Sequence, residues 1–189
     1  MNQPLGSEAQ EKLLRLARRT LEQWTSAHTT PSSGETAEYA SDPALSQLAA
    51  TFVSLHEHHE LRGCIGNLDP ADPLYVSVIQ NTVSAATTDP RFSSVRPEEL
   101  PDIDIEISVL SGYEPVRGPE DVAIGEHGLL VELGRARGLL LPQVAPQFGW
   151  NARQFLEHAA RKAGLAPDQW REAKILRFRA QVFGESQKP

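Results

Sequence analysis

One alternating segment limits the fold of this chain more than any other feature of the sequence. Between residues 102 and 109, four β-branched apolar residues alternate with four polar ones: Ile103, Ile105, Ile107 and Val109 with Asp102, Asp104, Glu106 and Ser108. Successive side chains of a strand point to opposite faces. The pattern therefore predicts a β-strand with one buried face and one wet, acidic face, as antiparallel sheets commonly have.

Two further pairs of segments have the pattern of β-hairpins. TFVSLH (51–56) and LRGCIG (61–66) flank a polar tetrapeptide, and GLLVEL (128–133) is joined to GLLLP through residues 134–138. If His56 pairs with Leu61, Val53 lies opposite Cys64 and Ser54 lies opposite Gly63. The alternating segment 174–183 predicts one further strand near the end of the chain.

Apolar residues recur at helical spacing in two segments of the first half. One helix is expected from about residue 8 to 25, with Ser7 and Gln10 as a capping box. The other is expected from about 73 to 88, where Asp89-Pro90 stops it.

A third helix is expected after Asn151, which is suited to cap it, and it ends near Ala163 with Gly164 in the C′ position. Residues 26–43 are rich in Ser, Thr, Ala and Pro without periodicity, which is typical of a loop or connector. Helices and strands interleave, but hairpins dominate. The sequence therefore predicts an α+β fold with a mainly antiparallel sheet packed with helices.

Composition bounds the functional classes. The chain has 189 residues, of which 40% are hydrophobic and 23% are charged, so we expect one domain over 1–189 with its motifs in 45–183. The net charge of −7 argues against nucleic acid or an anionic membrane as a main partner. One cysteine, Cys64, rules out a disulfide framework and a multi-thiolate zinc site. With no leader pattern and no apolar span, a cytoplasmic location is expected.

The segment LRGCIG contains residues that a strand alone does not explain. Gly63 and Gly66 weaken a strand, and such glycines mark a bulge or a close approach of backbone or ligand. Arg62 and Cys64 are two residues apart, so they project from the same face of an extended strand. A guanidinium there favours the ionised thiol and makes Cys64 a candidate nucleophile. The alternative is a small buried cysteine beside a surface or ion-paired arginine.

Residues 89–92 and His127 are the other candidates. A rigid turn after the second helix would present Asp89 to orient a base and Arg91 to bind an anionic substrate, with Phe92 beside them. The alternative is a helix stop with a local Asp–Arg pair and an anchoring Phe. His127 lies on a glycine-flanked turn, where an imidazole can serve as a general base to Cys64 or simply as a surface hydrogen-bonding group.

A group of histidines at the first hairpin resembles a metal site at first sight. His56, His58 and His59 are interleaved with Glu57 and Glu60. A polar hairpin turn explains all five residues without a metal, and the adjacent His58 and His59 tend to diverge. We therefore expect neither a metal centre nor another cofactor.

Taken together, these segments resemble the AMMECR domain family. The matching stretches keep the family's order: FVSLH, LRGCIG, DPRF, ELP (99–101), ISVL (107–110), HGL (127–129), LLLPQVAPQFGW (139–150), FLEHAARKAGL (155–165) and AQVF (180–183). The sequence is most similar to the AmmeMemoRadiSam system protein A subgroup, in which such a protein accompanies a Memo-family protein and a radical S-adenosylmethionine (SAM) enzyme.

The resemblance implies an α+β fold with a larger and a smaller lobe, and a groove that holds the LRGCIG segment. Cys64, Arg62, Asp89 and His127 match motif positions and are the expected catalytic group. The expected binding residues are Gly63, Gly66, Arg91 and Phe92.

Two functions remain open from the sequence. In the first, the protein is an enzyme or a substrate-handling subunit that works with Memo-family and radical SAM partners and uses Cys64 as its nucleophile. In the second, it is a non-catalytic binding or adaptor module for a peptide, a nucleotide-like ligand or a partner protein. RNA binding through the basic residues Arg171, Lys174, Arg177 and Arg179 has little support, because few aromatic residues accompany them.

Overall fold

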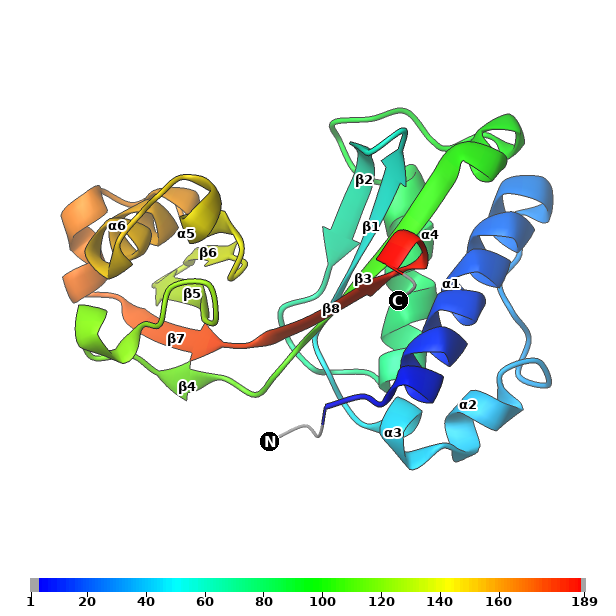
Figure 1. The fold of residues 1–189 in the computed structure, drawn as a ribbon, viewed down its shortest axis with the longest axis horizontal. Coiled ribbons are helices and arrows are strands. Elements are labelled where there is room, and N and C mark those ends of the chain that lie inside the picture. Colours follow the sequence, from blue (N-terminus) through cyan, green and yellow to red (C-terminus); the bar gives the residue numbers. More distant parts are fainter. Residues whose placement is uncertain (1–3, 188–189) are drawn as a thin grey trace. The chain divides into compact units, whose positions relative to one another are not determined.

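The computed structural model describes residues 4–187, and the chain divides into two compact units. Unit 1 contains the residues up to Val109 and those from Gln181 onward, and unit 2 contains Leu110–Ala180. Unit 2 is thus inserted into the chain of unit 1 (Figure 1). Each unit has helices packed with a four-stranded sheet, which confirms the predicted α+β class. Among the described residues, none of the helices has both the length and the apolar character needed to cross a membrane.

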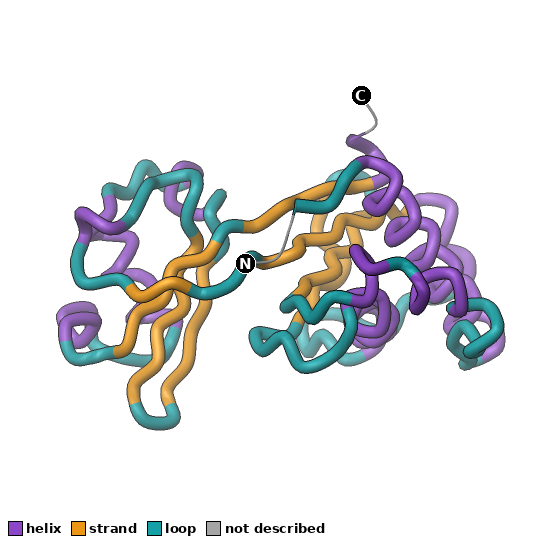
Figure 2. The backbone as a smooth tube through the Cα atoms, turned by 90° about the horizontal axis from the view of Figure 1, so that it is seen from below, coloured by secondary structure: helices purple, strands orange, loops and turns teal. Residues whose placement is uncertain are grey.

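Unit 1 is built on a sheet with the strand order β2-β1-β3-β8. Its elements are α1 (Ser7–Ala27), α2 (Ala37–Ser41), α3 (Pro43–Ser46), β1 (Thr51–Glu57), β2 (Glu60–Gly66), α4 (Leu74–Thr87), η1 (Pro97–Asp102), β3 (Ile103–Leu110), β8 (Ala180–Gly184) and η4 (Glu185–Gln187). Helix α4 packs on β1 and β2, and α1 packs on α4 (Figures 1 and 2). The core of unit 1 lies between these helices and the sheet.

The alternation in β3 has the predicted result. Its four β-branched apolar residues are buried, whereas Asp104 and Glu106 are only half-buried. Ser108 is buried as well, so the polar face is less uniformly wet than its sequence suggests.

Helix α1 begins where the sequence predicts, but its cap is different. Gly6 is the N-cap residue and Ser7 makes no capping hydrogen bond, so the predicted capping box is wrong. Gln10 instead donates its side-chain amide to the carbonyl of Leu5. The connector 26–43 is also more ordered than predicted, because it contains α2 and buries Tyr39 in the core of unit 1.

The first hairpin contains a β-bulge, one of the features that the glycines of LRGCIG indicated, but the assumed register did not include it. His56 pairs with Leu61 as assumed, but Leu55 then pairs with Gly63, which leaves Arg62 as the extra residue of β2. From there the register moves by one, so Cys64 lies opposite Ser54 rather than Val53. The predicted register is therefore wrong beyond the bulge.

The tip of the same hairpin is a two-residue turn formed by His58 and His59. Both residues have positive φ, 52° and 69°, which matches the type I′ turn that suits the twist of a hairpin. Neither residue is a glycine, so the turn carries the steric cost of left-handed backbone at two side-chain-bearing positions.

Unit 2 has a second sheet with the strand order β4-β7-β5-β6. Its elements are β4 (Glu114–Pro115), η2 (Pro119–Asp121), β5 (Gly128–Leu133), β6 (Ala136–Leu140), α5 (Val144–Gln147), α6 (Ala152–Lys162), η3 (Pro167–Arg171) and β7 (Lys174–Phe178). The Asn151 cap of α6 is confirmed, and Gln154 completes a capping box. Gly164 follows the helix with a φ of 79°.

Two strand predictions need correction. The β5–β6 turn is only residues 134–135, because residues 136–138 already belong to β6. The segment 174–183 is two strands, β7 in unit 2 and β8 in unit 1, separated at Arg179. Ile175 and Phe178 of β7 are buried, and Phe183 of β8 is buried in the core of unit 1.

Candidate functional site

The β-bulge sets the surroundings of Cys64 on β2. Because the register is shifted, Ser54 of β1 lies directly opposite, and its Oγ donates a hydrogen bond of 3.2 Å to Cys64 Sγ. Both residues are partly exposed, in contrast to the buried Val53, Leu55 and Gly63 beside them. The thiol is therefore on the less buried face of the sheet, away from α4, and a hydroxyl is in contact with it.

Asp89 connects this strand to the end of α4. The residue is only 4% exposed. Its Oδ2 accepts hydrogen bonds from the Cys64 backbone N–H (2.9 Å) and from Arg91 Nη2 (2.7 Å), and its Oδ1 accepts from Arg91 Nε (2.9 Å). These bonds, the Arg91 side chain foremost, hold the pKa of Asp89 well below its ordinary value, although burial acts against them. Asp89 is thus a fixed, ionised anchor.

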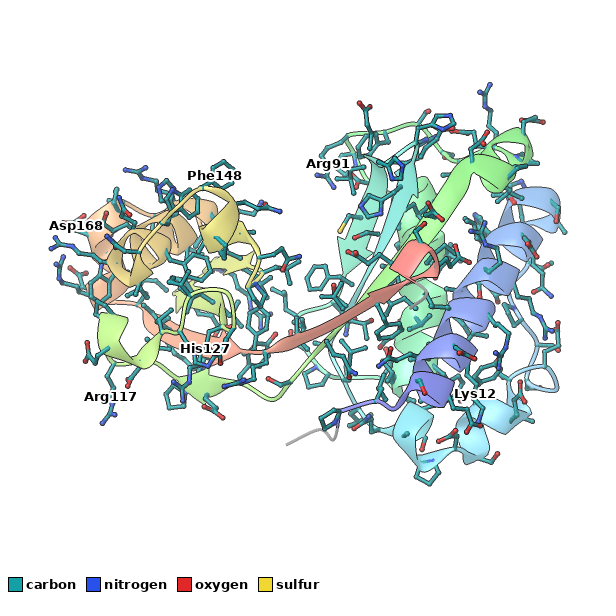
Figure 3. All side chains as sticks on the ribbon, in the orientation of Figure 1. Lys12, Arg91, Arg117, His127, Phe148 and Asp168 are labelled. Carbon is teal, nitrogen blue, oxygen red and sulfur yellow. The ribbon has the colours of Figure 1, made fainter. Side chains whose placement is uncertain are left out.

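Arg91 presents a positive charge at this point. Its side chain is 55% exposed and lies beside β2 (Figure 3). Asp89 binds one edge of its guanidinium, and the ring of Phe92 lies 5.4 Å from the guanidinium carbon. The hydrogen bonds to Asp89 raise the pKa of Arg91, although burial acts against them, and the electrostatic interaction with Cys64 acts in the same direction as the bonds. The guanidinium is therefore held in one orientation within electrostatic reach of the thiol.

Arg62, the arginine that the sequence analysis placed beside the thiol, binds elsewhere. Its Nε donates to Glu99 Oε1 (2.8 Å), and its Nη1 donates to the Ser93 carbonyl (2.9 Å). The Arg62 and Glu99 side chains are 12% and 13% exposed. The hydrogen bond from Arg62 lowers the pKa of Glu99. Arg62 therefore joins β2 to the segment that follows Phe92. Its guanidinium carbon lies 6.0 Å from the centroid of the Phe92 ring.

The two glycines of LRGCIG are explained by packing. A Cβ on Gly63 would lie 2.2 Å from the carbonyl oxygen of Ala85 in α4, far inside van der Waals contact. A Cβ on Gly66 would lie 2.3 Å from the ring of Phe52 and 2.4 Å from the carbonyl oxygen of Thr51. Both positions need glycine whether or not a ligand binds nearby.

His127 belongs to unit 2, where it closes a tight turn. The residue is 6% exposed, and its Nδ1 accepts a hydrogen bond of 3.0 Å from the backbone N–H of Ala123. Burial lowers its pKa, and the nearby charges of Arg177 and Arg179 lower it further. This neutral imidazole has a structural role in its own unit. Its action as a general base on Cys64 stays a prediction.

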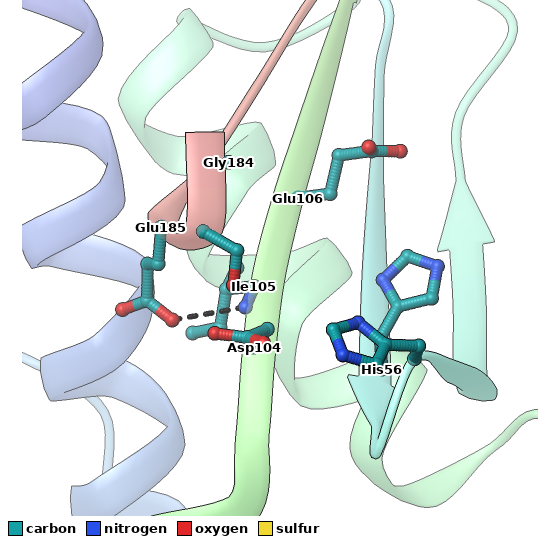
Figure 4. Close-up of a pocket in the computed structure, with 8 residues that line it drawn as sticks. His56, Asp104, Ile105, Glu106, Gly184 and Glu185 are labelled. Carbon is teal, nitrogen blue, oxygen red and sulfur yellow. Dashed lines mark hydrogen bonds between the residues drawn. The ribbon is translucent and has the colours of Figure 1, made fainter. Parts of the chain in front are cut away.

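A small cavity of about 150 Å³ lies elsewhere in unit 1 and includes part of the histidine group (Figure 4). Polar residues dominate its lining: His56, His59, Asp104, Glu106 and Glu185. There Glu185 Oε2 accepts a hydrogen bond of 2.9 Å from the backbone N–H of Ile105. Within residues 4–187, no group of three or more His, Cys, Asp and Glu residues is arranged to hold a metal ion.

Ser54 is the site residue that the sequence analysis missed. The hairpin pattern predicts β1 and β2, but the register it assumed placed Ser54 opposite Gly63. The signal that could have found it is the pair of glycines in LRGCIG, since strand glycines often mark a bulge and a bulge moves the register by one.

Comparison with known proteins decides the family. A family model described as AMMECR1 matches residues 14–183. The chain belongs to the AMMECR1 family. A relative from Methanothermobacter thermautotrophicus is 50% identical over 147 residues, which cover 74% of this chain and 77% of the relative. A relative from Thermofilum pendens is 40% identical, and the match covers 96% of this chain and 92% of the relative.

The family fold is also known from a crystal structure. An uncharacterized protein from Pyrococcus horikoshii superposes on this chain with a TM-score of 0.84 and 36% sequence identity. The match covers 93% of this chain and 90% of the other. The fold of this chain is thus similar to that of a protein of known structure.

Proposed function

We propose that this protein is an enzyme, or the substrate-handling subunit of one, in which Cys64 is the nucleophile. The observation that carries the proposal is the shared oxygen of Asp89. Asp89 Oδ2 binds the backbone of Cys64 and the guanidinium of Arg91, so a fixed positive charge lies within electrostatic reach of a partly exposed thiol. Such a charge favours the reactive thiolate.

The roles within the site differ from those first expected. Arg91, rather than Arg62, supplies the positive charge that favours the thiolate, because the Arg62 side chain is hydrogen-bonded to Glu99. Ser54 adds a hydroxyl that can donate to the thiolate. Asp89 positions Cys64 and Arg91 and does not exchange protons near neutral pH, because its pKa is held low.

The proposal includes partners. The ordered motifs from FVSLH to AQVF resemble those of the AmmeMemoRadiSam system protein A subgroup. We therefore propose that a Memo-family protein and a radical SAM protein supply or consume what this site handles.

Selective alkylation tests the nucleophile. Cys64 is the only cysteine of the chain, so incorporation of limiting iodoacetamide reports on this residue alone. We expect the folded protein to be labelled at pH 7 at a rate at least equal to that of the chain in denaturant, and C64S to take up no label at cysteine. A thiol that does not react until denaturant is added would contradict the nucleophile proposal.

A non-catalytic adaptor is the second candidate, and the packing of the motif favours it. Gly63, Gly66, Arg62 and Asp89 all have structural roles, so the motif can be required for shape alone. Co-purification of wild type and C64S from the native host, followed by mass spectrometry, separates the two functions. A C64S protein that captures the same partners and supports full function would favour the adaptor.

A further inference from the structure

We infer that unit 2 has a docking surface for single-stranded nucleic acid, in which an unpaired base stacks on the exposed ring of Phe148 and the phosphates bind Arg161 and Lys162. This surface does not involve Cys64, so the inference goes beyond the proposed function and is independent of it. Three features support it: a stack of aromatic rings, a rigid backbone beneath them and two cations without partners.

Three side chains of unit 2 form a ladder of stacked rings. The rings of Trp150 and His158 have centroids 3.6 Å apart and planes 6° apart. The Phe148 ring stacks on Trp150 at 4.8 Å and 16°. Trp150 also packs against the core of unit 2. Phe148 (Figure 3) is 65% exposed, more than any other large hydrophobic side chain in the described part of the chain. The last ring of the ladder is therefore open to solvent.

The backbone that holds this ring is fixed before any ligand binds. Helix α5 ends in a Schellman motif, in which the Trp150 N–H donates to the Ala145 carbonyl (2.9 Å) and the Gly149 N–H donates to the Pro146 carbonyl (3.1 Å). Gly149 has a φ of 65°, the left-handed conformation that the motif needs. The next residue, Asn151, caps α6. An aromatic ring on such a rigid segment loses little conformational entropy when a partner stacks on it.

Two exposed cations lie next to the inner end of the ladder. Arg161 and Lys162 follow His158 by three and four residues in α6, so they are its neighbours on the helix surface. Burial lowers the pKa of His158, and the charge of Arg161 lowers it further, so the guanidinium is within electrostatic reach of the ladder. Neither cationic side chain has a hydrogen bond or ion pair to another described residue. The one acidic residue of α6, Glu157, is paired with Arg153.

The combination of an open ring with unpaired cations favours a nucleic acid strand. Bases stack on Phe, Trp and His rings, and Arg and Lys bind the phosphates. An apolar or proline-rich peptide would use the ring but leave the cations unpaired. A duplex keeps its base faces inside its own stack, so only unpaired bases can extend the ladder. The surface is open, and a strand that crosses it makes more contacts than a single nucleotide does.

The distribution of charge allows this binding despite the net charge of −7. Unit 2 contains ten Lys and Arg residues and eight Asp and Glu residues, so the acidic excess belongs to unit 1. The attraction is therefore local, and binding should weaken as the salt concentration rises. The basic residues within 171–179, which the sequence analysis considered for RNA, are not part of this surface.

Fluorescence anisotropy with a labelled, unstructured RNA dodecamer tests the surface at about 50 mM salt. Phe148→Ala should weaken binding about five- to tenfold because it removes the stacking ring, whereas Phe148→Tyr should keep the wild-type affinity. Leu48→Ala removes an exposed apolar side chain from unit 1 and should leave the affinity unchanged. A DNA strand of the same sequence should bind similarly, because neither the ring nor the cations read a 2′-hydroxyl.

A charge variant tests the phosphate contacts separately. Arg161→Gln should weaken binding and reduce the slope of log affinity against log salt by about 0.7, the value for one phosphate contact on a single strand. Arg15→Gln changes the net charge by the same amount at an exposed position of α1 and should leave the slope unchanged. C64S should bind like wild type, which separates this surface from the proposed nucleophile.

Ultraviolet cross-linking of the same RNA to the wild-type protein needs no variant. Mass spectrometry of the digested complex should place the adduct within residues 148–150. Adducts confined to other segments would overturn the stacking surface, as would a Phe148→Ala protein that binds as tightly as wild type. Failure of the wild-type protein to bind the single strand, or tighter binding of the corresponding duplex, would overturn the inference as a whole.

Discussion

A single hydrogen bond distinguishes Cys64 from an ordinary half-buried cysteine. Ser54 Oγ lies 3.2 Å from the sulfur, on the neighbouring strand, at a position that the bulge at Arg62 brings opposite. Once the thiol ionises, only the hydroxyl has a proton to give, so the bond stabilises the charged form. In the proposed function, Ser54 and Arg91 both favour the thiolate, whereas Asp89 holds Cys64 and Arg91 in place.

Removing this hydroxyl is therefore expected to make the thiol less reactive. In Ser54→Ala, alkylation by iodoacetamide at pH 7 should be about three- to tenfold slower. Ser54→Thr keeps a hydroxyl and should stay close to wild type. The measurement is the alkylation rate of the folded proteins at pH 7, and identical rates for all three would contradict a role for Ser54.

The sequence analysis placed the candidate residues in the right segments but assigned some of them the wrong partners. Cys64, Asp89, Arg91 and Phe92 do come together in unit 1. Arg62 pairs with Glu99, which lies 37 positions further along the chain, and no local pattern reveals such a contact. Side-chain pairing over this distance is set by tertiary packing, which periodicity does not describe.

At the scale of elements, the close packing of β2 on α4 explains why this strand contains glycine. The strand approaches the helix so closely at Gly63 that its neighbour there is the backbone of Ala85. Helix α4 was predictable from its apolar stripe and from the Asp89-Pro90 stop. The glycines of LRGCIG indicated a bulge but not its position, because one extra residue leaves an alternating pattern that fits two registers. The split between β7 and β8 escaped prediction for a similar reason, since the segment alternates almost throughout.

This packing predicts a large effect of one methyl group. Gly63→Ala forces a Cβ against the Ala85 carbonyl, and we expect the free energy of unfolding to fall by about 2–3 kcal/mol. Gly34→Ala is the matched control, because its nearest contact is 4.0 Å away, and it should change stability by less than about 1 kcal/mol. Urea denaturation measures both, and equal stabilities would show that β2 can move away from α4 at no cost.

At the scale of the whole molecule, the two histidines of unit 2 with shifted pKa values couple its stability to pH. Burial lowers the pKa of His127 and of His158 below the ordinary value of 6.5, and neighbouring arginines add to the effect. The unfolded chain therefore binds protons at a pH where the folded chain does not. The contribution of these two histidines to the free energy of unfolding is fully present above about pH 6.5 and is lost as the pH falls below that value.

We accordingly expect the free energy of unfolding to decrease between pH 7 and pH 5. His127→Asn keeps an acceptor for the Ala123 N–H and should make this decrease smaller, and a further His158→Gln change should reduce it again. Carboxylates with lowered pKa values, such as Asp89 and Glu99, contribute mainly below this range. Denaturation curves at pH 7, 6 and 5 provide the measurement. A wild-type protein that becomes more stable on acidification would contradict the assignment.

Because unit 2 is inserted into the chain of unit 1, the sheet of unit 1 can be completed only after unit 2 has been synthesised. Strand β8, the last of the β2-β1-β3-β8 sheet, follows the whole of unit 2 in the chain. Until about residue 184 has emerged, β3 is an edge strand with unpaired backbone groups, and such edges invite pairing with other chains. Nascent chains that stop before β8 are therefore the species most prone to aggregate, and the edge of β3 is protected only once β8 has been synthesised.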